Sequence, residues 1–206
     1  MITSFHTINS SSTGEYREKG SKFIGLAFPA GSEDDVKTRL TEIKKKYFDA
    51  RHHCFAYILG PDKTKFRAYD DGEPNHSAGD PILGQIRSRN LTNVLVIVVR
   101  YFGGTKLGVG GLVTAYKTAA DEALKHAVIV EQQITVPLVF EFAYETTPVI
   151  MKLVKDFGLT IRSQAFESSC TLEAEILLSL KESLLEKVRL LQATGTVFTA
   201  RVVENH

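Results

Sequence analysis

The sequence lacks tryptophan and has only two cysteines and two methionines among its 206 residues. Cys54 and Cys170 lie far apart, so the chain has neither a disulfide framework nor the cysteine spacing of a zinc or redox motif. A reducing cytoplasm is therefore the expected location. No apolar run approaches the roughly 20 residues that span a bilayer. The first ten residues also lack the basic and apolar segments of a signal peptide, so no membrane partner is expected.

An excess of either charge is also missing. The chain has 25 lysines and arginines against 24 aspartates and glutamates, a formal net charge of +1. Overall charge therefore predicts no nucleic-acid partner by itself. The hydrophobic fraction of 43% and the charged fraction of 24% are typical of a globular protein. The length is sufficient for one or two domains that bury a core without disulfides or metals.

A change in pattern near residues 131–137 predicts two domains, 1–133 and 134–206. A polar stretch there is followed by Pro137 and a new strand-like run. The second domain has strand patterns at about 138–143, 159–166, 170–178 and 197–203. Two helices are expected between them, one capped by Thr147 with Pro148 at its first position and one over about 180–193. This β-α-β-β-α-β order is that of a ferredoxin-like domain, so we predict the α+β class.

The first domain mixes strands and helices. Strands are expected within 16–30 and at 54–59, and the β-branched run at 94–102 predicts a strand buried on both faces. Ser32 and Asp35 have the spacing of a capping box that begins a helix. Asp80 before Pro81 predicts a short helix to about residue 89, and a third helix is expected over about 112–127.

Five glycines follow the predicted buried strand: Gly103, Gly104, Gly108, Gly110 and Gly111. Glycines before a helix allow backbone N–H groups to converge on an anion, and the helix N-terminus favours negative charge. The segment matches neither a P-loop nor the dinucleotide fingerprint. Two interpretations remain: an anion-binding loop, or a tight strand-to-helix turn without a ligand.

Residues 85–120 contain five cations and no acid. Such segregation in a chain of balanced charge predicts a local positive surface suited to phosphate backbones. Tyr101 or Phe102 offers a ring on which a base could stack. The alternative is a set of scattered solvated cations beside core aromatics. The cations are Arg87, Arg89, Arg100, Lys106 and Lys117.

The carboxylates of Asp70, Asp71 and Glu73 fall within four residues. They suit either a Mg²⁺ site shared with ligand phosphates or ordinary turn structure, and pairing with Arg51 or Arg100 would fix the loop. The turn is the favoured interpretation.

The segment around His52 and His53 invites interpretation as a zinc site or a nucleophilic pair. Adjacent strand residues point to opposite faces, so we expect these two histidines not to share a metal ion. No third residue orients a pair between Cys54 and a histidine. We therefore predict no metal, no cofactor and no identifiable catalytic residue.

Several segments in this order resemble the IMPACT/YigZ family. Asn75-His76-Ser77 departs from the small residues found there in many members. The matching segments are Ala50-Arg51-His52-His53-Cys54, Asp70-Asp71-Gly72-Glu73-Pro74, Ala78-Gly79, Pro81-Ile82-Leu83, Val98-Val99-Arg100-Tyr101-Phe102-Gly103-Gly104, Leu107-Gly108-Val109-Gly110-Gly111-Leu112-Val113 and Ala115-Tyr116.

The resemblance implies an IMPACT N-terminal domain, similar to the second domain of a small-subunit ribosomal protein. It also implies a C-terminal domain similar to the ferredoxin-like end domains of elongation factor G. Eukaryotic relatives act in translational control through a ribosome-associated activator of a stress kinase, using an added N-terminal module.

We therefore expect a translation-associated regulatory factor that binds RNA or the ribosome through the basic glycine-loop surface, without DNA specificity. The alternative is a phosphate-ligand enzyme that uses the glycine loop and the carboxylates of Asp70, Asp71 and Glu73. Non-enzymatic binding is favoured, because no catalytic residue is identified.

Overall fold

The computed structural model describes residues 2–166 and 169–203. These residues form two compact units, 2–132 and 133–203. Each unit has its own sheet and its own hydrophobic core. Helices accompany antiparallel sheets in both units, so the chain has the α+β class expected from the sequence.

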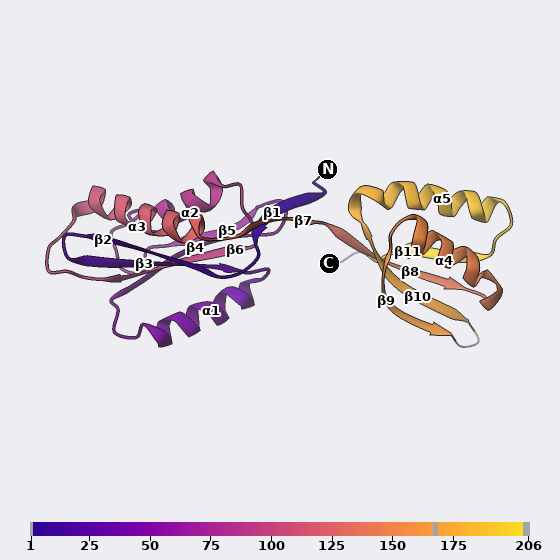
Figure 1. The fold of residues 1–206 in the computed structure, drawn as a ribbon, viewed down its shortest axis with the longest axis horizontal. Helices are drawn as coiled ribbons and strands as arrows, with labels where there is room; N and C mark the ends of the chain where they lie inside the picture. Colours follow the sequence, from indigo (N-terminus) through magenta and orange to yellow (C-terminus); the bar gives the residue numbers. More distant parts are fainter. Residues whose placement is uncertain (1, 167–168, 204–206) are drawn as a thin grey trace. The chain divides into compact units, whose positions relative to one another are not determined.

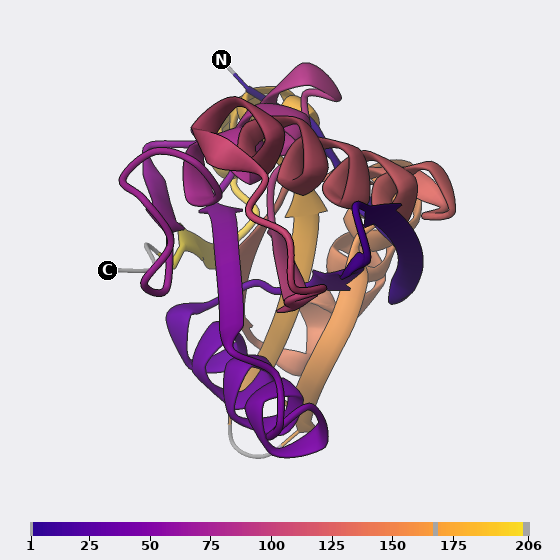
Figure 2. The ribbon, with the colours of Figure 1, turned by 90° about the vertical axis from the view of Figure 1, so that its left-hand side faces the viewer.

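The first unit is a five-stranded antiparallel sheet covered by helices on both faces (Figures 1 and 2). The order across the sheet is β2-β3-β6-β4-β5. A separate two-stranded sheet pairs β1 with β7. The strands are β1 (Ser4–Ile8), β2 (Ser12–Glu18), β3 (Ser21–Pro29), β4 (His52–Leu59), β5 (Lys65–Tyr69), β6 (Val94–Tyr101) and β7 (Ile129–Gln133), and the helices are α1 (Glu33–Lys46), α2 (Gly79–Ser88) and α3 (Gly108–Lys125).

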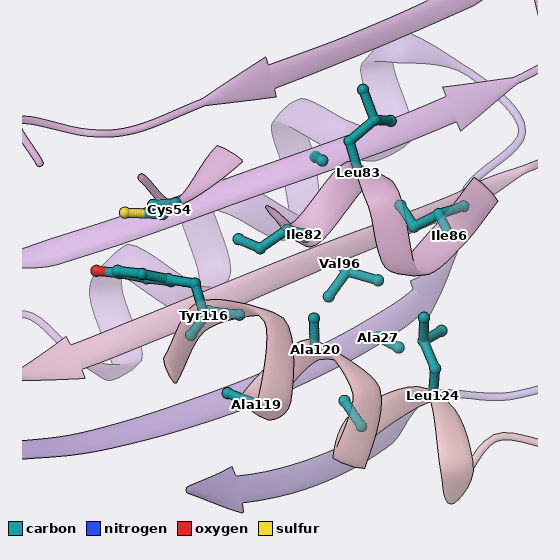
Figure 3. Packing of buried hydrophobic residues seen from close by; sticks show 14 of the residues in the cluster. Ala27, Cys54, Ile82, Leu83, Ile86, Val96, Tyr116, Ala119, Ala120 and Leu124 are labelled. Atoms are coloured by element: carbon teal, nitrogen blue, oxygen red, sulfur yellow. The ribbon is translucent and has the colours of Figure 1, made fainter. Parts of the chain in front are cut away.

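The central strand β6 is buried on both faces, which confirms the expectation from its apolar sequence. Alternate residues of a strand point to opposite faces. Val94, Val96 and Val98 join the core under α2 and α3, whereas Leu95 and Ile97 join the core under α1. Figure 3 shows the first of these cores, in which Val96 lies among the side chains of α2 and α3.

Helix α1 begins with the predicted capping box. The amide of Asp35 donates to Ser32 Oγ at 3.1 Å, and the amide of Ser32 donates to Asp35 Oδ2 at 3.0 Å. Two N-terminal amide groups are thereby satisfied, and Val36 and Ile43 bury the apolar side of the helix.

Helix α3 lies close to the sheet over two facing glycines. Gly14 of β2 and Gly25 of β3 are paired across the strands. A Cβ atom at Gly25 would lie 2.1 Å from the carbonyl oxygen of Ala119, and one at Gly14 would lie 2.5 Å from the amide nitrogen of Ala123. Both neighbours are helix backbone, so the close approach requires residues without side chains.

Gly25→Ala should lower the free energy of unfolding by about 1–3 kcal/mol, because α3 must move away from the sheet. Gly84→Ala is the matched control, since nothing lies within 4 Å of a Cβ added in the middle of α2. The control should raise stability by about 0.4–1 kcal/mol by restricting the unfolded chain. Urea denaturation measures both, and equal effects of the two variants would contradict the close approach.

The second unit is a four-stranded antiparallel sheet in the order β11-β8-β10-β9. Its elements follow one another as β-α-β-β-α-β, the order expected from the sequence. A 3-10 turn precedes each helix. The elements are β8 (Thr135–Phe142), η1 (Tyr144–Thr146), α4 (Thr147–Asp156), β9 (Thr160–Phe166), β10 (Cys170–Leu177), η2 (Leu178–Leu180), α5 (Lys181–Ala193) and β11 (Phe198–Val202).

The two helix starts expected at threonine and aspartate differ from the prediction. Thr147 is the first residue of α4, and its hydroxyl donates to the carbonyl of Tyr144 at 2.6 Å instead of capping. Asp80 lies inside α2, after an N-cap at Ala78 that makes no side-chain capping bond. In both cases the prediction misplaced the cap, because the chain turns into the helix before the expected residue.

No helix in residues 2–166 and 169–203 is long and apolar enough to cross a membrane.

Candidate functional site

The acidic loop between β5 and α2 is held together by its own carboxylates. Asp70 accepts three backbone N–H groups, from His76 at 2.9 Å, Ala78 at 3.0 Å and Gly79 at 2.8 Å. Two of these donors are at the start of α2. Asp70 therefore performs the capping that the sequence pattern assigned to Asp80, and it does so from ten residues upstream.

Asp71 joins the same loop to β4. Its Oδ2 accepts the backbone N–H of His53 at 2.7 Å, and its carbonyl oxygen lies 2.8 Å from His52 Nδ1. A carbonyl oxygen only accepts, so His52 Nδ1 carries the proton and donates. Asp71 and Gly72 have φ values of +44° and +85°, the left-handed turn that brings the loop back toward the strand.

Glu73 is buried beneath α3, where it pairs with Arg100. Arg100 Nη1 donates to Glu73 Oε1 at 2.5 Å, and the Tyr116 hydroxyl donates to the same oxygen at 2.7 Å. The side chains of Glu73 and Arg100 are 5% and 7% exposed. Burial, together with the charge of Glu73, raises the pKa of Tyr116 far above its ordinary value.

The three carboxylates therefore do not converge on a common point. Each is bonded within the fold: one to the start of α2, one to β4 and one to β6 and α3. Within residues 2–166 and 169–203, no group of three or more His, Cys, Asp or Glu is arranged to hold a metal ion. All three carboxylates thus take part in hydrogen bonds that fix this loop.

The two adjacent histidines point to opposite faces of the sheet, as predicted for a strand. His53 Nε2 donates to the carbonyl of Tyr47, and burial lowers the pKa of His53. Cys54 is fully buried, its thiol donates to the carbonyl of Asp70 at 3.0 Å, and burial raises the pKa of the thiol well above its ordinary value. A protonated thiol is a poor nucleophile, and the hydrogen bond of the Cys54 thiol goes to a backbone carbonyl rather than to a histidine.

The glycine loop combines close packing with an open helix start. A Cβ atom at Gly103 would lie 1.9 Å from the backbone carbon of Gly20, so Gly103 allows contact with the β2–β3 turn. Gly108 begins α3 with a φ of +72°. Gly110, in the first turn of α3, has open space around it. Gly104 and Gly111 complete the loop and the first turn.

The five predicted cations do not form one open positive surface. Arg100 is buried against Glu73, and Arg89 pairs with Asp121 at 2.6 Å. The Arg87 guanidinium lies 4.5 Å from the ring centroid of Phe66. Acids distant in the sequence neutralise two of the five, which corrects the expectation drawn from the acid-free segment 85–120. Lys106 and Lys117 are exposed.

The two predicted aromatic residues have different environments. The Tyr101 hydroxyl donates to Asp49 Oδ1 at 2.8 Å, which raises the pKa of Tyr101. Phe102 is 46% exposed, and the Arg100 guanidinium lies 5.6 Å from its ring centroid. Phe102 is therefore the aromatic residue that offers a face to a ligand.

A recess of about 450 Å³ lies at the N-terminus of α3 and brings several of these groups together. Strand register explains part of the convergence, because Arg100 of β6 faces His52 of β4 and Phe23 of β3. Arg51 immediately precedes β4, and β4 pairs with β6. This pairing places Arg51 near the glycine loop, which follows β6. The recess is lined by Arg51, His52, Glu73, Pro74, Arg100, Phe102, Lys106, Leu107, Gly108, Val109 and Leu112.

Arg87, Arg89 and Lys117 do not line this recess. Pro74, Val109 and Leu112 line it, although no sequence pattern marks them as binding residues. A larger hollow of about 590 Å³ at the start of α1 contains Asp35 and Glu131 but no cationic side chain among its described lining residues. The smaller recess is therefore the better candidate for an anionic ligand.

Comparisons with known proteins agree with the family resemblance carried by the sequence segments. Residues 19–124 match the family described as the Impact N-terminal domain. The chain is 36% identical over 134 residues to the IMPACT family member YvyE of Bacillus subtilis, covering 65% of this chain and 62% of YvyE. The matched segment thus spans less than two thirds of that relative.

A second relative covers more of the chain. An IMPACT family member of Haemophilus influenzae is 33% identical over 156 residues, covering 73% of this chain and 74% of that protein. A crystal structure described as that of an hypothetical protein superposes with a TM-score of 0.76 at 24% identity over 100% of both chains, and supports the fold. The family match and these relatives show that the chain belongs to the IMPACT family.

Proposed function

We propose that this protein is a translation-associated regulatory factor that binds RNA, free or within the ribosome, through the recess at the N-terminus of α3. The observation that carries the proposal is the set of groups around this recess. Arg51 and Lys106 are exposed cations, α3 has no acid in its first turn, and Phe102 presents part of its ring. Cations bind phosphates, and an exposed ring stacks on bases without sequence preference.

Family membership supports the translational part of the proposal, because the resemblance implies translational control for eukaryotic members. We further propose that residues 1–133 are the IMPACT N-terminal domain and that residues 134–206 are a ferredoxin-like domain resembling the end domains of elongation factor G. The β-α-β-β-α-β order and the sheet order β11-β8-β10-β9 support the second assignment. Two free, buried cysteines support a cytoplasmic location.

The enzyme alternative loses its main support. It required Asp70, Asp71 and Glu73 to hold a metal ion together, and each of them is bonded to a different part of the fold.

The double variant Arg51→Gln/Lys106→Gln tests the proposal. Fluorescence anisotropy with single-stranded RNA should show weaker binding of all sequences. The slope of log affinity against log salt should fall by about 0.7 for each RNA phosphate that the variant no longer neutralises. The matched control is Lys44→Gln/Lys45→Gln, which removes the same charge from the last turn of α1, on the other face of the sheet.

The control should bind RNA like the wild type. If both double variants lose the same affinity, the effect is one of net charge and the recess is not the binding surface. If the recess variant binds RNA and ribosomal particles as well as the wild type across the salt series, the proposal is wrong.

A further inference from the structure

We propose that the recess holds a terminal phosphate monoester, either the phosphorylated end of an RNA strand or a free mononucleotide. This inference rests on the proposed function and makes it more specific, because it distinguishes the end of a strand from its interior. Four features of the recess carry it: a buried unpaired donor, an uncapped helix start, the local charge and an exposed ring.

The buried donor is Nε of Arg100. This residue is 5% exposed, and its Nη1 is occupied by Glu73. Its guanidinium lies 5.4 Å from the Phe23 ring centroid and 5.6 Å from that of Phe102. In the part of the chain that the structure describes, Arg100 Nε has no hydrogen-bond partner. A buried N–H without a partner is unfavourable, and Arg100 lines the recess, so binding of an acceptor against this side chain would be favoured.

The start of α3 adds donors to the same recess. Leu107 at the N-cap makes no side-chain capping bond, and the first turn of this 18-residue helix contains no acid. The first N–H groups of a helix have no partner within it, and the helix dipole favours an anion at this end. Gly108 and Val109 line the recess, and Gly110 beside them has open space around it. An oxyanion is the ligand class that satisfies both the helix start and the arginine.

The charges of the lining residues fit a dianion. The lining contains three cationic side chains, those of Arg51, Arg100 and Lys106, and one carboxylate, that of Glu73. Their net charge is therefore +2 when histidine is counted as neutral. A phosphate monoester carries about −1.5 to −2 at neutral pH. A phosphodiester inside an RNA strand carries a single negative charge. The recess therefore matches the monoester better.

The burial of Arg100 favours an end over an interior segment. Arg100 lines the recess but is almost fully buried, so a ligand must enter the recess to approach this side chain. A strand end enters with one covalent connection, whereas an internal phosphate must bring chain in on both sides. Phe102, which is 46% exposed, then offers its ring to the base next to that phosphate.

The test compares RNA hexanucleotides of one sequence carrying a 5′-phosphate, a 3′-phosphate or hydroxyl groups at both ends. Binding is measured by fluorescence anisotropy at fixed ionic strength, with AMP and adenosine as competitors. One phosphorylated end should bind about tenfold tighter or more than the hydroxyl-ended RNA, as an added charge-assisted hydrogen bond would give. AMP should compete and adenosine should not.

The outcomes separate this inference from the proposed function. Equal, salt-dependent binding of all three RNAs overturns the end site and leaves RNA binding intact. Binding of AMP without binding of any RNA upholds the phosphate monoester site and overturns the proposed function. No binding of RNA or AMP overturns both.

Val109→Glu provides a variant that should fold. Val109 is 55% exposed and lines the recess, so a carboxylate there would repel phosphate. An acid in the first turn of a helix favours folding, so the thermal melt should not fall. The variant should lose the preference for the phosphorylated end, while Lys44→Gln/Lys45→Gln should keep it. A folded Val109→Glu variant with an unchanged preference would overturn the site.

Discussion

Replacing Arg100 with methionine should lower the free energy of unfolding by about 3–5 kcal/mol, because the Glu73 side chain would remain buried without its cation. The two side chains are 7% and 5% exposed, and their nearest atoms are 2.5 Å apart. Tyr116 would still donate to Glu73, but one neutral hydrogen bond does not replace a cation. Urea denaturation monitored by circular dichroism measures the change.

Arg89→Met is the matched control, since it breaks the Arg89–Asp121 pair, whose side chains are 20% and 27% exposed. Its cost should be about 0–1 kcal/mol. Adding Glu73→Gln to Arg100→Met should recover part of the stability, because the unpaired charge is removed. If Arg100→Met costs no more than Arg89→Met, the buried pair does not stabilise the fold.

Alkaline pH should destabilise the first unit through Cys54 and Tyr116. Burial raises the pKa of each side chain above its ordinary value, which is 9.0 for Cys54 and 10.0 for Tyr116. Figure 3 shows both at the same end of the core. Above these ordinary pKa values the unfolded chain loses both protons while the folded protein keeps them. The free energy of unfolding therefore has its full value at lower pH and falls as the pH rises above them.

The free energy of unfolding should fall by about 1.4 kcal/mol per pH unit for each group that titrates. This decrease should begin near pH 9 with Cys54, and its slope should double near pH 10, where Tyr116 also titrates. Cys54→Ala removes the first contribution while leaving the other groups in place. Its free energy of unfolding should therefore fall less than that of the wild type between pH 9 and pH 10. Parallel curves for the two proteins would show that the thiol is not protonated preferentially in the fold.

Local patterns predict most of the fold. The apolar run of β6 and the capping box at Ser32 and Asp35 depend on near neighbours in the sequence, and both are confirmed. Strand β5 is missing from the prediction because its sequence, KFRAY, is short and mostly exposed. Strands β1 and β7 are short and gain their regularity from pairing with each other. Helix α3 begins at Gly108 rather than Leu112, because glycine hides a helical pattern.

The candidate site is harder to predict than the fold, because its defining contacts are distant in the sequence. Glu73 and Arg100 are 27 positions apart, and Arg89 and Asp121 are 32 apart. A count of charges within 85–120 does not include the partners supplied from outside that segment. The motif around Arg51 and the glycine loop can each be identified from the sequence, but only the pairing of β4 with β6 brings them to one recess.

The position of β6 between β3 and β4 has a consequence for synthesis of the chain. The β2–β3 and β4–β5 hairpins are complete by Tyr69, but the strand that joins them ends at Tyr101. At about 5–20 residues per second, a ribosome needs roughly two to six seconds to make the intervening segment. During that interval the inner edges of both hairpins lack a partner, and unpaired edges promote aggregation. We therefore expect the nascent chain to be most prone to aggregation between the synthesis of Tyr69 and that of Tyr101.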